Sequence, residues 1–328
     1  MTARTALTMG DPAGVGPEIV VKLLNGLWQG PAPVVIGDVR HLREVSNQLG
    51  LGMQVVPLQH IGQARSNGDT IEVLEVGSPL VDVPTGNVDA ACGRAAFAYI
   101  DRAIALAVAG EVDAIVTAPI NKASLGLAGI DYPGHTEMLT VLGGAERTAM
   151  MLANDELRVV LVTIHCSMRE ALDLITMDTE LATIHLAHEG ARQFGIERPR
   201  IAVAGLNPHA GEDGRFGREE IDVLQPAIAR ARAQGLDVSG PWPGDTVFMR
   251  ARQGEFDVVV AQYHDQGLIP VKYLGLAQGV NVTLGLPFVR TSPDHGTAFD
   301  IAGKGIADPA SLHSALTQAH RLLAVRAG

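Results

Sequence analysis

The stretch FDVVVAQYHDQG, residues 256–267, decides the fold. It begins as a continuous run of apolar β-formers and then changes abruptly to polar, titratable side chains at Tyr263, His264 and Asp265. Strands without polar alternation are typical of parallel sheets that helices cover on both faces. Further runs of this kind are RTALTMG (4–10), APVVIGD (32–38), DAIVTAP (113–119), LRVVLVTIH (157–165) and RIAVAGLNPH (200–209).

Helical patterns separate several of these runs. Examples are CGRAAFAYIDRAIALAVAGE (92–111) and DTELATIHLAHEGARQFG (178–195). Alternation of buried strands with helices predicts an α/β protein with mostly parallel sheets. Segment 61–93, rich in Gly, Pro and Asp, is expected to run over the surface.

Composition limits the classes of function. The 328 residues leave room for two domains, and a net charge of −11 argues against a nucleic-acid partner. Only Cys92 and Cys166 carry thiols, the N-terminus lacks the order of a signal peptide, and no apolar run approaches the roughly 20 residues of a membrane helix. We therefore expect a soluble, cytoplasmic protein without membrane or nucleic-acid partners.

Three of the strand-like runs end in a histidine: His165, His209 and His264. Ligands of open parallel sheets bind beyond the carboxyl ends of the strands, so these three imidazoles could meet at one point. Such a set is typical of a catalytic divalent-metal site, with Asp245 and Asp265 as supporting carboxylates. The alternative for each histidine alone is an ordinary hydrogen-bonded loop residue. Two further histidines, His135 and His295, lie in predicted loops. The remaining histidines are expected to be solvated: His41, His60, His185, His188, His313 and His320.

Two glycine-rich segments could form loops that bind a ligand. GDPAGVGPE (10–18) fits neither common nucleotide motif, and a tight turn before a helix that carries Pro17 and Glu18 in its first turn explains it better. DHGTAFDIAGKGIADP (294–309) would let a ligand approach the backbone closely. Candidate holders of an anionic group are Lys122, Lys272, Asn281 and Arg290.

Together the motifs resemble the 4-hydroxythreonine-4-phosphate dehydrogenase family of vitamin B6 biosynthesis. The resemblance spans about residues 5 to 310 and is carried by TMGDPAGVGPEI, DAIVTAPINK, YPGHTE, NPHAGEDGRFGREE, GPWPGDTVF, YHDQG, GVNVTLGLPFVRTS and DHGTAFDIAGKG. The last of these is also similar to the adenine-side loop of isopropylmalate dehydrogenases, relatives with the same fold.

The resemblance implies a fold of two α/β/α lobes with an active cleft between them. One lobe would comprise residues 1–128 plus 297–328, and the other, residues 129–296, would carry the metal histidines and the interface of a homodimer that shares its active sites. The implied site residues are His165, His209 and His264 for the metal; His135, Thr136, Lys272, Asn281 and Arg290 for the substrate; His295, Gly296, Thr297, Ala298 and Asp300 for the cofactor; and Lys272, Asp265 and Asp245 for catalysis.

The implied activity is oxidation of 4-phosphohydroxy-L-threonine at its C3 hydroxyl to a β-keto acid, which decarboxylates to 3-amino-2-oxopropyl phosphate. The cofactors would be NAD, or else NADP, and one zinc, magnesium, cobalt or manganese ion. The stretch CSMREALDLIT after His165 departs from the biosynthetic pattern and is closer to dehydrogenases of four-carbon acid-sugar phosphates such as D-threonate or D-erythronate 4-phosphate. The pair His135 and Thr136 argues against a dihydrodiol dehydrogenase. A non-catalytic metal- or nucleotide-binding regulator is the alternative from another class.

Overall fold

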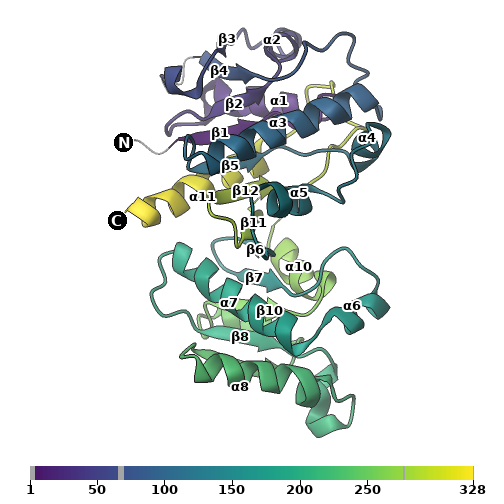
Figure 1. Cartoon of the computed structure of the whole chain (residues 1–328), viewed down its shortest axis with the longest axis vertical. Helices are drawn as coiled ribbons and strands as arrows, with labels where there is room; N and C mark the ends of the chain where they lie inside the picture. The colour runs from purple at the N-terminus through teal and green to yellow at the C-terminus, as the bar shows by residue number, and fades with distance from the viewer. Residues whose placement is uncertain (1–3, 66–69, 276–277, 328) are drawn as a thin grey trace. The chain divides into compact units, whose positions relative to one another are not determined.

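The computed structural model in Figure 1 describes residues 4–65, 70–275 and 278–327. The chain divides into two compact units. The first contains the residues up to Glu146 together with Leu286–Leu323, and the second contains Arg147–Gly285 with the residues from Ala324 onward. The lobe boundaries at residues 128 and 296 that the resemblance implies stay a prediction. Within the described ranges no helix has both the length and the apolar character needed to cross a bilayer.

The sheet of the first unit is parallel throughout, with the strand order β3-β4-β2-β1-β5-β12. Its strands are β1 (Thr5–Thr8), β2 (Val34–Gly37), β3 (Gln54–Leu58), β4 (Thr70–Glu75), β5 (Ala114–Thr117) and β12 (Val289–Pro293). Every residue of β1, β2 and β5 is buried, as their unbroken apolar runs predict.

Helices cover this sheet. They are α1 (Gly16–Lys22), α2 (Val39–Gln48), α3 (Ala90–Val108), α4 (Lys122–Leu127), α5 (His135–Leu142) and α11 (Ala310–Ala327). The long helix α3 crosses the strands in Figure 1 and contacts β1, β2 and β5. It begins where the Asp89 carboxylate accepts a hydrogen bond from the Cys92 N–H at 2.9 Å, a side-chain cap that satisfies one free backbone donor.

The second unit has a mixed sheet in the order β11-β6-β7-β10-β8-β9. Strands β7, β10, β8 and β9 are parallel neighbours, whereas β6 pairs antiparallel with both β11 and β7. The strands are β6 (Ala149–Ala153), β7 (Arg158–Leu161), β8 (Ile201–Ala204), β9 (Val238–Trp242), β10 (Val258–Ala261) and β11 (Val280–Leu284). The helices are α6 (Met168–Leu174), α7 (Met177–Gln193), α8 (Gln225–Ala233), α9 (Val247–Arg252) and α10 (His264–Tyr273).

Alternation along β10 divides this core between the two faces of the sheet. Val259 and Ala261 pack in one apolar cluster with Phe248 of α9 and Leu268 of α10. Residues of the opposite parity point away from that cluster, toward the side where α7 contacts β10. The next residue of that parity is Gln262.

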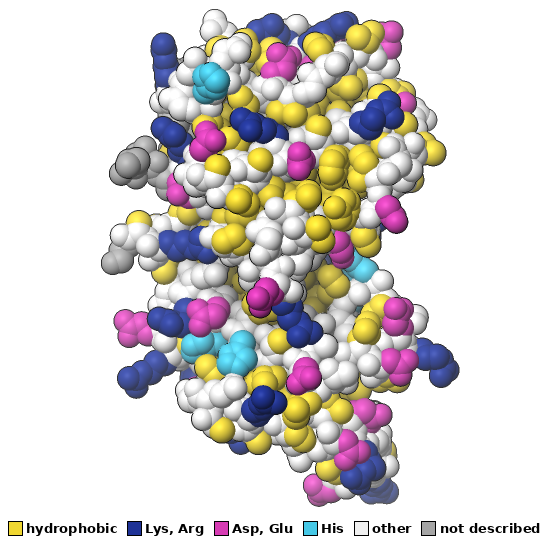
Figure 2. Space-filling view, viewed as in Figure 1, with side chains coloured by type: hydrophobic (Ala, Val, Ile, Leu, Met, Phe, Trp, Pro, Cys, Tyr) yellow, Lys and Arg dark blue, Asp and Glu magenta, His cyan; other side chains and the backbone are white. Residues whose placement is uncertain are grey.

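The predicted α/β class is confirmed, and all six strand-like runs form strands: β1, β2, β5, β7, β8 and β10. The expectation that segment 61–93 only runs over the surface is wrong, because it contains β4, whose residues 71–74 are buried between β2 and β3; its residues 66–69 lie outside the described part. His41 is also not solvated, since it is buried with its Nε2 3.0 Å from the Pro12 carbonyl oxygen. Figure 2 shows Lys and Arg scattered among Asp and Glu on the face in view.

Candidate functional site

The structure brings His165 and His264 together at the carboxyl ends of neighbouring strands. Their ring centroids are 5.8 Å apart, and His264 Nδ1 lies 2.7 Å from Asp265 Oδ1. Both rings border a hollow of about 240 Å³ that is also lined by Thr163, Ile164, Cys166, Met168, Ala171, Tyr263 and Asp265. With Nδ1–H donating to Asp265, the Nε2 lone pair of His264 is available to a ligand.

His209 lies in an unusual left-handed turn that follows β8. The φ angles of residues 209 to 213 are 53°, 52°, 79°, 41° and 53°. Four of these five residues are not glycine, and each left-handed L-residue costs about 1 kcal/mol. His165 also has a positive φ, 47°. Backbone strain at two of the three predicted ligands marks this end of the sheet as a candidate functional site.

Glu220 holds the start of this turn. Its Oε1 accepts hydrogen bonds from the backbone N–H groups of Leu206 at 2.8 Å and Asn207 at 2.7 Å, and its Oε2 accepts one from Asn207 Nδ2 at 2.9 Å. The side chain is almost fully buried. A single carboxylate therefore satisfies the backbone just before the strained residues.

We expect Glu220→Leu to lower the free energy of unfolding by about 3 kcal/mol, since three half-buried donors lose the bonds that this carboxylate accepts. Urea denaturation of the purified variant measures this change. Asp222→Asn is the matched control, because Asp222 pairs with Arg218 on the exposed surface, where such pairs contribute little. Equal stability of the two variants would show that Glu220 does not hold the turn.

The donor chemistry of the site suits a divalent ion that prefers nitrogen ligands. Within the described ranges, however, no three His, Cys, Asp or Glu side chains are grouped so as to hold an ion. The imidazole pair of His165 and His264 therefore fits part of a ligand set, and His209 of the same chain does not complete it.

Three other predicted residues lie elsewhere in the second unit. Lys272 is half-buried near the end of α10, two helical turns beyond His264, and Asn281 is on β11 with its Oδ1 buried. Asp245 is exposed in the turn before α9. This turn lies against Gln266, because a Cβ added at Gly244 would be 3.0 Å from Gln266 Nε2.

The first unit holds Arg290, His135 and Thr136. Arg290 on β12 is 2% exposed, and its Nη2 donates to Thr117 Oγ1 at 2.7 Å. Burial lowers the pKa of Arg290 to about 9, against the attraction of Glu137, so the guanidinium stays charged at pH 7. Burial, and then the nearby charge of Arg290, hold the pKa of His135 well below its usual value. This group thus presents a fixed cation beside a neutral imidazole at the start of α5.

The predicted cofactor loop is held against the N-terminal glycine segment. The Val15 N–H donates to the Thr297 carbonyl at 3.0 Å, and a Cβ at Gly14 would come within 2.9 Å of Thr297. The predicted turn and helix at residues 10–18 are confirmed, with Pro17 and Glu18 in the first turn of α1. Thr297 is buried, whereas His295, Gly296 and Asp300 are exposed and Ala298 adopts a φ of 42°.

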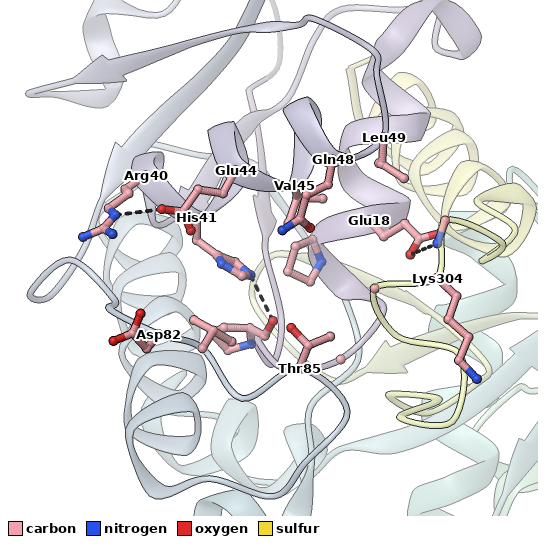
Figure 3. Close-up of a pocket in the computed structure, with 16 residues that line it drawn as sticks. Glu18, Arg40, His41, Glu44, Val45, Gln48, Leu49, Asp82, Thr85 and Lys304 are labelled. Atoms are coloured by element: carbon pink, nitrogen blue, oxygen red, sulfur yellow. Dashed lines mark hydrogen bonds and ion pairs between the residues drawn. The ribbon is translucent and has the colours of Figure 1, made fainter.

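Figure 3 shows a second hollow, of about 290 Å³, beside this loop. Arg40, His41 and Glu44 of α2 form one side, and Gly303–Gly305 form another. Glu18 also lines the hollow and accepts a hydrogen bond from the Ala307 N–H at 2.8 Å, while Lys22 donates to the Gly305 and Ala307 carbonyls. The glycine-rich backbone is therefore fixed at the edge of an open space.

Sequence reasoning missed three buried residues that organise the second unit: Glu180, Glu220 and Gln262. Glu180 and Glu220 lie in helical stretches where an acidic residue is usually solvated, so only the tertiary structure reveals their burial. Gln262 does follow the β10 run directly, and its parity with Val258 and Val260 was the available signal.

In the second unit, neighbouring parallel strands end in a pair of imidazoles, and in the first unit a glycine-rich loop follows β12. Side chains and loops at strand ends are the usual ligand-binding features of α/β proteins. The model of the family described as pyridoxal phosphate biosynthetic protein PdxA matches residues 29–319, and the chain belongs to this family.

Known relatives are similar in sequence to this chain over nearly its whole length. The chain is 57% identical to the 4-hydroxythreonine-4-phosphate dehydrogenase of Beijerinckia indica, covering 97% of this chain and 94% of the relative. It is 48% identical to the D-threonate 4-phosphate dehydrogenase of Cupriavidus necator, covering 98% and 97%. The solved 4-hydroxythreonine-4-phosphate dehydrogenase of Klebsiella pneumoniae matches with a TM-score of 0.88 at 46% identity, covering 98% and 99%.

Proposed function

We propose that the protein is a nicotinamide-dependent dehydrogenase that oxidises 4-phosphohydroxy-L-threonine at its C3 hydroxyl, after which the β-keto acid loses carbon dioxide to give 3-amino-2-oxopropyl phosphate. Membership of the PdxA family and 57% identity to a relative named for this substrate support the proposal. The observation that carries it is the imidazole pair of His165 and His264, at the ends of adjacent parallel strands.

The residues of the chain have separate roles in this proposal. Arg290, with the neutral His135 and with Thr136, binds the anionic group of the substrate. Asp265 orients the His264 ring through Nδ1, which leaves Lys272 as the group to receive the proton of the substrate hydroxyl while hydride passes to the nicotinamide ring. A divalent ion held by the imidazoles would lower the pKa of that hydroxyl and stabilise negative charge during decarboxylation.

For the cofactor we propose NAD, bound along residues 295–300 with its adenylate part toward the hollow of Figure 3. The exposed His295, Gly296 and Asp300 offer polar contacts, and Ala298 turns the backbone at its positive φ. Asp300 would accept hydrogen bonds from ribose hydroxyls and would repel the additional phosphate of NADP.

We also propose a homodimer in which the partner supplies the third imidazole. Ile269 and Tyr273 of α10 are 63% and 91% exposed, and Met168 and Leu172 of α6 are also exposed. Met168 lines the hollow beside the imidazole pair. Apolar side chains around an incomplete ligand set suit a surface that a second copy covers.

D-threonate or D-erythronate 4-phosphate is the second candidate substrate, favoured by the 48% identical relative named for D-threonate 4-phosphate and by the stretch after His165. In this chain Ser167 caps α6 by accepting from the Glu170 N–H at 3.2 Å. Cys166, Met168 and Ala171 of the same stretch line the hollow beside the imidazoles. A different wall would alter the space around C2 of the substrate.

Reduced-nicotinamide formation tests the proposal when the purified protein is offered the three substrates with zinc and with EDTA. We expect the highest kcat/KM with 4-phosphohydroxy-L-threonine and loss of at least about 90% of the activity in EDTA. A higher kcat/KM with an acid-sugar phosphate would select the second candidate. Binding of NAD without turnover of any substrate would favour a non-catalytic regulator.

A further inference from the structure

Buried and half-buried polar side chains connect the ends of the three strands that precede the predicted ligands. Thr163 Oγ1 donates to the Gln262 carbonyl at 2.7 Å, and Gln262 Nε2 donates to the Ala204 carbonyl at 3.0 Å. Gln266 accepts from the Gln262 N–H through Oε1 and donates to the Gly205 carbonyl through Nε2, both at 2.7 Å. The ends of β7, β10 and β8 are thus joined by side chains beyond the last backbone pairs of the sheet.

Each joined strand end leads directly into a predicted ligand. His165 follows Thr163 by two residues, His264 follows Gln262 by two residues, and His209 lies four residues beyond Gly205. An extended chain spans at most about 3.6 Å per residue, so segments this short limit how far each histidine can move from its anchor. The geometry of the imidazoles therefore depends on how Gln262 is held.

Glu180 of α7 supports Gln262 from the face of the sheet opposite α9 and α10. The side chain is fully buried, and Gln262 Nε2 is 3.4 Å from Glu180 Oε1. Within the described ranges Glu180 Oε2 has no hydrogen-bond partner. An ionised carboxylate with so little support would cost several kcal/mol. Burial raises the pKa of Glu180 to about 8, so the side chain is a neutral acid at pH 7.

We propose that Glu180 is a positioning residue of the site: as an uncharged hydrogen-bonding partner it fixes the Gln262 amide, which holds the His264 and His209 strand ends in register. The role in catalysis rests on the proposed function, whereas the role in ordering the strand ends does not. Glu180→Gln keeps a neutral acceptor of nearly equal size and should preserve the arrangement. Glu180→Leu fills the same space but leaves the Gln262 amide without this partner.

Amide hydrogen exchange of the metal-free protein tests the ordering. We expect exchange in segments 205–211 and 262–267 to become about ten-fold faster in Glu180→Leu and to match wild type in Glu180→Gln. Gln262→Leu should reproduce the fast exchange if Glu180→Leu does not fold. Glu189→Leu, at an exposed position of the same helix, is the matched control and should change neither segment. Unchanged exchange in both test variants, or acceleration spread evenly over the second unit, would overturn the proposal.

Zinc affinity from competition with a chelator provides the second readout. We expect Glu180→Leu to bind zinc about 10- to 100-fold more weakly and Glu180→Gln to stay within about two-fold of wild type, as for groups that orient metal ligands. Equal zinc affinity of wild type and Glu180→Leu would overturn the link to the histidines. If wild type itself binds no zinc, the proposed metal-dependent function fails, and the exchange data still decide whether Glu180 orders the strand ends.

Discussion

Replacing His209 by alanine is expected to reduce turnover by about a thousand-fold or more, which corresponds to a loss of about 4 kcal/mol of transition-state stabilisation. The fold should survive, because the described contact of the His209 ring is with Phe216 at 6.1 Å between centroids, and Ala210 already adopts the same left-handed conformation. The measurements are kcat with saturating zinc, zinc stoichiometry and Tm. Full activity of the variant would remove His209 from the ligand set.

Mixing two inactive variants tests whether the set is shared between subunits. In a heterodimer of His209→Ala and His165→Ala, one of the two sites keeps all its ligands if His209 comes from one subunit and His165 from the other. Random assortment would then restore about a quarter of wild-type activity. A mixture of His165→Ala with His264→Ala is the control and should restore none, since the structure places both rings in one chain. Absence of restoration in both mixtures would exclude a shared site.

The second large effect is expected at Arg290. Arg290→Met should lower kcat/KM by about 100- to 1000-fold, chiefly through a higher KM. The substitution removes the desolvated cation that is proposed to bind the anionic group of the substrate. Stability should be retained, since an apolar side chain of similar length removes the cost of burying a charge. Steady-state kinetics and a thermal melt measure both quantities.

Two companion variants sharpen the assignment of Arg290. Arg290→Lys keeps the charge but not the forked geometry and should recover only part of the loss. Thr117→Val removes the hydroxyl that Arg290 contacts and should cost about ten-fold or less. A normal KM in Arg290→Met would leave the buried guanidinium with a structural role alone.

The strands predicted from sequence are those whose apolar runs carry their own signal. Strand β12, which holds Arg290, could not be found in this way. Its sequence VRTSP is buried throughout, although only Val289 is an apolar β-former and the other residues are Arg, Thr, Ser and Pro. Strand β6, AMMLA, consists of residues that favour helices, and β9 contains Gly240 and Pro241, which usually end strands. In each case packing in the sheet overrides local preference.

The candidate site was predictable to a similar degree. The proximity of His165 and His264 could be predicted, because each follows a strand-like run and ligands of parallel sheets bind beyond the carboxyl ends of the strands. The left-handed turn at His209 had no such signal, because Ala210 and Glu212 rarely adopt positive φ. Its shape depends on Glu220, which lies eleven residues beyond His209 in sequence.

The insertion of Arg147–Gly285 between the two segments of the first unit has a consequence for synthesis on the ribosome. Strand β5 leaves the exit tunnel long before its parallel partner β12, and the whole of Arg147–Gly285 is translated between them. The nascent chain must therefore keep an unpaired β5 edge protected while the inserted unit folds. Arg290 arrives with the strand that pairs with this edge, so the residue proposed to bind the anionic group is in the last strand of the first sheet to be assembled.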